Sequence, residues 1–223
     1  MSENLQSNTK SYKIILIGSS AIGKTSLCNR IQKKEFNSEM PITIGVDFMT
    51  LELTDYDTFT QLRNIYNIQL WDTAGHEKFS AITKTYYRNS NVVLLCFDLT
   101  SRTSFIELDK WMIDIKSIID QPYYICLMGL KSDLDSVITD EEITEFLNKY
   151  LITTYHRYSS KKTINTKTIE AILINAVKKY DLLIEDMTYA RELSTSKFKL
   201  DNAIINPLIS AEDTRLDNIK YCC

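Results

Sequence analysis

The chain has 223 residues, enough for one full domain with an extension. Hydrophobic residues make up 44% and charged residues 25%, which allows a sizeable core and argues against wholesale disorder. With 26 Lys and Arg residues against 29 Asp and Glu residues, the net charge of −3 gives no basic field, so we expect no nucleic-acid partner. No apolar run approaches the roughly 18 residues that a membrane span needs.

Short apolar segments alternate with amphipathic ones along the chain. The apolar segments are residues 12–17, 68–71, 92–97 and 125–128, with 151–158 as a weaker candidate, and residues 48–71 favour a hairpin. Helical spacing marks residues 104–119 and 169–180, and Thr139 with Glu142 forms a capping box before a third helix. Alternating strands and helices predict an α/β fold, a doubly wound and mostly parallel sheet with helices on both faces.

Composition also suggests how the chain is divided. Residues 1–10 are polar and lack the apolar core of a secretory signal, so we expect a flexible N-terminus on a chain that stays in the cytosol. Residues 11–190 would form a nucleotide-binding domain, and residues 191–223, where apolar periodicity fades, a flexible tail. Cysteines 28, 96 and 126 sit in apolar segments without metal-ligand spacing, which makes a zinc site improbable.

A phosphate-binding loop is the strongest local signal. Residues 18–25 (GSSAIGKT) match G-x-x-x-x-G-K-[ST] directly after the first predicted strand and before an amphipathic helix. We expect Lys24 to reach the β- and γ-phosphates and the Thr25 hydroxyl to bind Mg²⁺. The alternative is a solvated glycine turn with an exposed lysine. The predicted nucleotide-binding residues here are Gly18, Ser19, Ser20, Ala21, Ile22, Gly23, Lys24, Thr25 and Ser26. Kinases, ATPases and GTPases all use such a loop.

A second motif, residues 71–77 (WDTAGHE), ends another predicted strand. Asp72 would lie at the carboxyl end of a strand neighbouring the phosphate loop, where a second group for Mg²⁺ is needed. Gly75 leaves room for its N–H to approach a γ-phosphate. The alternative is an aspartate that caps the following helix.

These motifs resemble a small GTPase of the Ras superfamily, Rab family. The resemblance runs from about Ser11 to Lys179 and is carried by residues 44–48, 68–71, 78–83 and 86–88 (IGVDF, IQLW, KFSAIT and YYR). It implies a six-stranded domain whose switch loops respond to GTP, with Thr43 completing the Mg²⁺ shell and sensing the γ-phosphate. Loss of that phosphate would free Thr43 and Gly75. The separation of Lys24 from Asp72 exceeds the family's, and we place the insertion near residues 56–64.

The resemblance extends to guanine recognition. Leu130, Lys131 and Asp133 match the family's Asn-Lys-x-Asp except at the first position. Asp133 would accept from the two N–H groups of guanine, and the stem of Lys131 would cover one face of the base. Ser159, Ser160 and Lys161 match the family's Ser-Ala-Lys, whose backbone N–H reads the guanine oxygen. The alternative for Lys131 and Asp133 is a charged loop after a strand.

Two departures from the family pattern affect activity. His76 stands where the family's glutamine orients the attacking water, so we expect slow intrinsic hydrolysis with Lys24, Thr43, Gly75 and His76 as catalytic residues. The alternative is that His76 is an exposed loop residue and another group positions the water. Leu130 removes an amide that can bridge the base and the phosphate loop, which predicts weaker nucleotide affinity and quick GDP release unless another group compensates.

The sequence ends in Cys222 and Cys223. In Rab proteins such an end implies geranylgeranylation of both thiols by prenyl-transfer and chaperone proteins, and two chains anchor stably to a membrane surface. Unmodified cysteines are the alternative.

The predicted function is a switch on the cytosolic face of an internal or plasma membrane, regulating vesicle traffic through effector, exchange-factor and GTPase-activating proteins. A scaffold with little hydrolysis is the second candidate. A kinase is disfavoured, because we find no arginine cluster for a lid.

Overall fold

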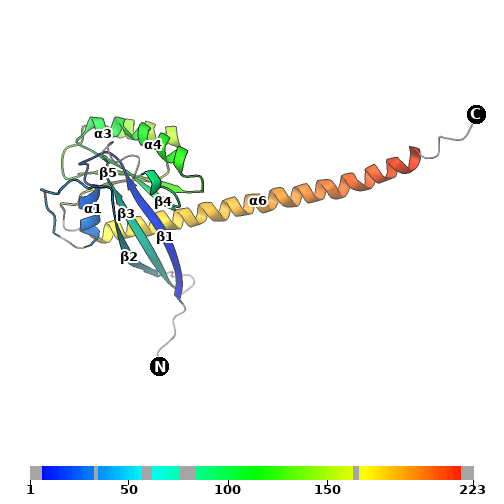
Figure 1. The fold of residues 1–223 in the computed structure, drawn as a ribbon, viewed down its shortest axis with the longest axis horizontal. Coiled ribbons are helices and arrows are strands. Elements are labelled where there is room, and N and C mark those ends of the chain that lie inside the picture. Colours follow the sequence, from blue (N-terminus) through cyan, green and yellow to red (C-terminus); the bar gives the residue numbers. More distant parts are fainter. Residues whose placement is uncertain (1–6, 33–34, 57–61, 76–83, 163–165, 217–223) are drawn as a thin grey trace, which may run out of the picture. The chain divides into compact units, whose positions relative to one another are not determined.

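A six-stranded sheet forms the centre of the protein in the computed structural model, which describes residues 7–32, 35–56, 62–75, 84–162 and 166–216 (Figure 1). The strand order is β2-β3-β1-β4-β5-β6, and only the β2–β3 pairing is antiparallel. The predicted α/β class and mostly parallel sheet are confirmed. The strands are β1 (Ser7–Ile17), β2 (Val46–Tyr56), β3 (Arg63–Thr73), β4 (Val92–Asp98), β5 (Tyr124–Leu130) and β6 (Tyr155–Tyr158).

Two apolar clusters cover the two faces of the sheet. In β1, Ile14 and Ile15 are both fully buried but belong to opposite clusters, which explains why the strand shows no apolar–polar alternation. One cluster includes residues from α1 (Lys24–Ile31) and from α6 (Thr166–Leu216) as far as Val177. The other includes residues from α4 (Leu108–Ile118) and α5 (Asp140–Tyr150).

Several elements differ in extent from the prediction. The helix expected over residues 104–119 is two helices, α3 (Arg102–Ile106) and α4, which meet at Glu107. The hairpin is longer than expected, since β2 and β3 have 11 residues each, and the stretch between Tyr56 and Arg63, where we placed the insertion, lies mostly outside the described residues. β1 begins at Ser7, before the domain start expected at residue 11. The capping box of Thr139 and Glu142 is present at the start of α5.

The chain divides into two compact units, Met1–Tyr180 and Asp181–Cys223. Helix α6 continues past residue 190, where we expected the folded domain to end, as far as Leu216. Within residues 166–216 the sequence has a single proline, Pro207, and no glycine, so few residues interrupt the helix. The expected flexibility of this segment stays a prediction. Among the described residues, no helix has the length and apolar character to cross a membrane.

The carboxyl ends of the parallel strands share one edge of the sheet. Gly18 follows β1, the segment from Ala74 follows β3, Lys131 follows β5 and Ser159 follows β6. In open parallel sheets this edge is where ligands bind. The sheet therefore brings together the loops that carry the predicted site residues.

Candidate functional site

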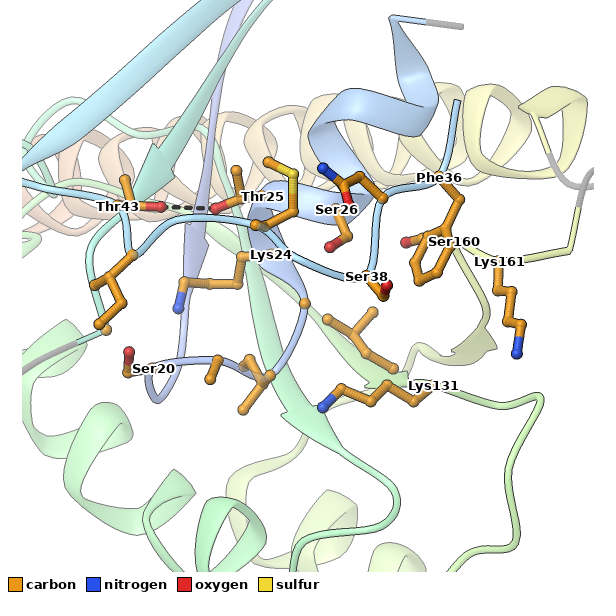
Figure 2. Close-up of a pocket in the computed structure, with 18 of the residues that line it drawn as sticks. Ser20, Lys24, Thr25, Ser26, Phe36, Ser38, Thr43, Lys131, Ser160 and Lys161 are labelled. Atoms are coloured by element: carbon orange, nitrogen blue, oxygen red, sulfur yellow. Dashed lines mark hydrogen bonds between the residues drawn. The ribbon is translucent and has the colours of Figure 1, made fainter. Parts of the chain in front are cut away.

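A cavity of about 410 Å³ opens at this edge of the sheet. Figure 2 shows Lys24, Thr25 and Thr43 toward one end of the cavity and Lys131, Ser160 and Lys161 toward the other. The predicted residues that line it are Ser20, Ala21, Ile22, Gly23, Lys24, Thr25, Ser26, Thr43, Gly75, Leu130, Lys131, Asp133, Ser160 and Lys161. The two groups of residues predicted from separate motifs thus share one continuous space.

The phosphate loop adopts a conformation that needs glycine. Gly18 has φ 151°, and a Cβ there would overlap the carbonyl of Cys96 in the neighbouring strand β4. Gly23 has φ 109° and precedes the first residue of α1. The backbone therefore curls tightly from β1 into α1, and the free N–H groups at the start of α1 make that end of the helix favourable for an anion.

Lys24 is held inside the loop. Its side chain is buried, and its Nζ donates hydrogen bonds to the carbonyls of Gly18, at 2.8 Å, and Ser19, at 2.7 Å. Burial lowers the pKa of Lys24, and the negative charge of Asp72 opposes this. The buried ammonium is held by two neutral carbonyl groups, so an anionic ligand placed in the loop would stabilise its charge.

Three oxygen-bearing side chains meet beside the start of α1. The Thr25 hydroxyl donates to Asp72 Oδ2 at 2.6 Å and lies 2.7 Å from the Thr43 hydroxyl (Figure 2). Asp72 is 2% exposed, and burial raises the pKa of its carboxyl against the hydrogen bond from Thr25. Its Oδ1 is buried and accepts no hydrogen bond from the described residues. Hydroxyls with a carboxylate behind them fit Mg²⁺, and the unpaired Oδ1 can accept from a metal-bound water.

Gly75 lies against the phosphate loop. A Cβ on Gly75 would overlap the main chain of Ser19 and Ser20, so only glycine fits at this approach. The neighbouring Ala74 N–H donates to the Gly45 carbonyl at 2.9 Å, which links the end of β3 to the segment that carries Thr43. The two predicted switch segments are thus connected through their backbones. His76 lies outside the described residues.

At the other end of the cavity, side chains connect the two loops predicted to read the base. Asp133 Oδ1 accepts from the Ser159 hydroxyl at 2.6 Å, and Ser159 is fully buried. Lys131 has φ 60°, and its Nζ pairs with Asp98 Oδ2 at 2.7 Å. Asp98 therefore fixes the side chain of Lys131 at the cavity wall, while Ser159 orients the Asp133 carboxylate.

Leu130 fills the position that the family gives to asparagine. Its side chain is 2% exposed, and its Cδ1 would lie 3.9 Å from a Cβ on Gly23. The leucine therefore lies close to Gly23, and it belongs to the same buried apolar cluster as Ile22 of the phosphate loop. It supplies no hydrogen bond from its side chain to either the loop or a ligand.

Some predicted residues lie behind the cavity wall. Gly18, Asp72 and Ser159 support lining residues, whereas Ser19 lines a neighbouring hollow. There the Ser19 hydroxyl donates to Glu107 and accepts from Trp111 Nε1 at 3.3 Å.

Sequence reasoning missed residues 36–42, of which all but Glu39 line the cavity, including Phe36 beside Ser160 (Figure 2). A lone phenylalanine in a polar stretch carries no motif that would have revealed it.

Comparison with known proteins agrees with this arrangement. A model of the Ras family matches residues 13–179. The chain is 35% identical over 180 residues to Ras-related protein Rab-32D of Dictyostelium discoideum, covering 78% of this chain and 76% of the relative. It is 32% identical over 176 residues to Ras-related protein Rab-11C of the same organism, covering 68% of this chain and 75% of the relative. The chain therefore belongs to the Ras family of small GTPases, as a Rab-like GTP-binding switch.

Proposed function

We propose that this protein is a membrane-anchored guanine-nucleotide switch that hydrolyses GTP slowly and recruits effector proteins in vesicle traffic. The observation that carries the proposal is one cavity with the buried ammonium of Lys24 toward one end and the oriented Asp133 carboxylate at the other. A ligand with a purine at one end and a polyphosphate at the other matches both ends.

At the phosphate end, Lys24 would exchange its bonds to the Gly18 and Ser19 carbonyls for phosphate oxygens. Thr25 and Thr43 would hold Mg²⁺, with Asp72 behind them. When bound there, Mg²⁺ neutralises charge on the β- and γ-phosphate oxygens. The backbone N–H groups of the loop and of Gly75 would stabilise the charge that develops on the transferred phosphoryl group.

At the base end, Asp133 would accept from the two N–H groups on the Watson–Crick edge of guanine. Adenine would leave this carboxylate partly unpaired, which favours guanine strongly. The stem of Lys131 would cover one face of the base, and Phe36 offers an aromatic side chain on the same cavity.

The switch itself would act through Thr43 and Gly75. Both line the cavity that Lys24 also lines, where the γ-phosphate would lie, and the Ala74–Gly45 backbone bond links their segments. Ile42, Ile44 and Phe48 flank Thr43 and are 64%, 79% and 58% exposed. Apolar side chains so exposed beside the proposed phosphate sensor support an effector with a complementary apolar surface, which would bind when GTP orders this segment.

Slow hydrolysis and membrane anchoring rest on residues outside the described part of the chain. His76 would orient the attacking water less well than glutamine, because its ring is bulkier and places its donor and acceptor at a different reach. Cys222 and Cys223 would carry the two prenyl chains. A scaffold that binds GTP without turnover would share the cavity and differ only in phosphate release.

The test is calorimetric binding of GTP, GDP and ATP to the full chain, with and without Mg²⁺, followed by single-turnover phosphate release. We expect both guanine nucleotides to bind in a Mg²⁺-dependent way, ATP to bind far more weakly, and phosphate to be released slowly. The matched control is Asp133→Asn, which replaces an acceptor by a donor. This variant should lose affinity for GDP and gain affinity for xanthosine diphosphate, which carries a carbonyl in place of the 2-amino group. A chain that binds no purine nucleotide at millimolar concentration would refute the proposal.

A further inference from the structure

We propose that Arg30 is a positioning residue for guanine recognition, which ties the base-reading loop at Ser159, Ser160 and Lys161 to the helix that begins at the phosphates. This inference rests on the proposed function, because it concerns how the same cavity holds its nucleotide. It identifies the group that compensates for the missing amide at Leu130.

The geometry places Arg30 between the two ends of the site. It lies in the last turn of α1, the helix whose first residues are Lys24 and Thr25. Its Nε donates to the Ser160 carbonyl at 2.8 Å, and its Nη2 lies 3.4 Å from the Lys161 carbonyl. Leu27 and Ile31 on the same helix are buried in the core, so the base of the arginine side chain is fixed relative to the sheet.

The base-reading loop needs such an anchor at Ser160. The Ser159 hydroxyl donates to Asp133 and accepts from the Lys161 N–H at 3.2 Å, so it holds the start of the loop. The family resemblance gives the guanine-reading backbone N–H to Ser159, Ser160 and Lys161 together, and we place it at Ser160, which lines the cavity. Arg30 binds the carbonyl of that same residue, so it fixes the peptide plane that follows the Ser160 Cα, while Ser159 holds the residue before it.

Leu130 makes this connection more important. An asparagine there would join the base to the phosphate loop by hydrogen bonds, whereas Leu130 offers the loop only apolar contact. The route from phosphate to base through α1 and Arg30 is polar and charge-assisted instead. The planar guanidinium reaches two successive carbonyls, which the single ammonium of a lysine cannot do with the same geometry.

The test measures release of three diphosphates from wild type, Arg30→Gln and Arg30→Lys in the full chain. GDP is the reference. Inosine diphosphate keeps the 6-oxygen but lacks the 2-amino group, whereas 6-thioguanosine diphosphate keeps both N–H groups that face Asp133 and replaces the oxygen by sulfur, a weak acceptor. Arg63→Gln, an exposed arginine at the start of β3, is the matched control. Thermal unfolding reports whether each variant is folded.

We expect Arg30→Gln to speed release of GDP and of inosine diphosphate about tenfold, the usual scale for a lost charge-assisted hydrogen bond. Release of 6-thioguanosine diphosphate should change less than about twofold, since its contact with Ser160 is already weak. Arg30→Lys should fall between wild type and Arg30→Gln, and Arg63→Gln should match wild type.

Two results would overturn this inference alone. Equal acceleration for all three diphosphates would mean that Arg30 supports the pocket generally and does not position the base-reading N–H. Unchanged release of GDP from a folded Arg30→Gln protein would mean that the loop needs no such anchor. Failure of wild type to bind GDP at all is a distinct outcome, which would refute the proposed function and this inference with it.

Discussion

Replacing Leu130 by asparagine should move nucleotide binding and protein stability in opposite directions. In the nucleotide-free protein the change removes a nearly fully buried leucine, which costs about 2 kcal/mol of lost burial, and adds an amide whose unmet hydrogen bonds cost about 1–3 kcal/mol more. With nucleotide bound, the amide would lie between the phosphate loop and the base and would gain hydrogen-bond partners on both. A gain of about 1–3 kcal/mol corresponds to GDP release slowed roughly 5- to 150-fold.

The assay follows displacement of a fluorescent GDP derivative by excess GDP in Mg²⁺, with urea unfolding of the nucleotide-free protein alongside. Leu130→Ala is the control, because it loses the same packing near Gly23 and adds no amide. It should be destabilised and release GDP no more slowly than wild type. If Leu130→Asn is folded and still releases GDP at the wild-type rate or faster, then the missing amide does not limit affinity.

Four further predictions concern the phosphate end and the lipid anchor. His76→Gln should raise single-turnover phosphate release on the order of 10-fold or more, and equal rates would contradict a role for His76 in slow hydrolysis. Gly75→Ala should weaken the binding of GTP more than that of GDP, because the added Cβ would overlap the main chain of Ser19 and Ser20. We expect the two losses of binding free energy in calorimetry to differ by about 1–3 kcal/mol. Burial lowers the pKa of Lys24 below its ordinary 10.5, so between the folded pKa and 10.5 the unfolded chain binds more protons at this residue, and its contribution to stability rises with pH. Lys24→Met should lose that contribution, measured as the difference between wild type and variant in the pH dependence of urea unfolding of the nucleotide-free protein. Cys222→Ser with Cys223→Ser should move the protein from the membrane fraction to the soluble fraction in prenylating cells.

The sheet and the phosphate end could be predicted because their signals are contiguous. The eight-residue phosphate-loop motif by itself predicts a strand before it and a helix after it. The carboxyl ends of parallel strands necessarily lie at one edge of the sheet. Asp72 could therefore be placed near Thr25 without knowing any contact. The end of α6 at Leu216 could not be predicted in this way, because the sequence after about residue 190 shows no regular spacing of apolar residues.

The residues that sequence reasoning missed depend on contacts between distant segments. Arg30 and Ser160 are separated by 130 positions, and no local pattern distinguishes this arginine from a solvated one. Glu107 and Trp111 reach Ser19 from the start of α4 in the same way. Phe36 comes to the cavity because the loop before β2 folds back over it. Such contacts depend on the path of the whole backbone, so no local sequence pattern predicts them.

Helix α1 explains how one site can bind two chemically unlike ends of a ligand. Its first turn carries Lys24 and Thr25, and its last turn carries Arg30, so eight residues join the phosphate end to the base-reading loop. A helix packed through Leu27 and Ile31 is held in place on this scale, since one of its faces is buried in the core. A displacement of α1 caused by losing phosphate contacts would therefore reach Ser160 through Arg30. Release of the two ends should then be coupled, so that Arg30→Gln lessens the effect of Mg²⁺ removal on the release of GDP.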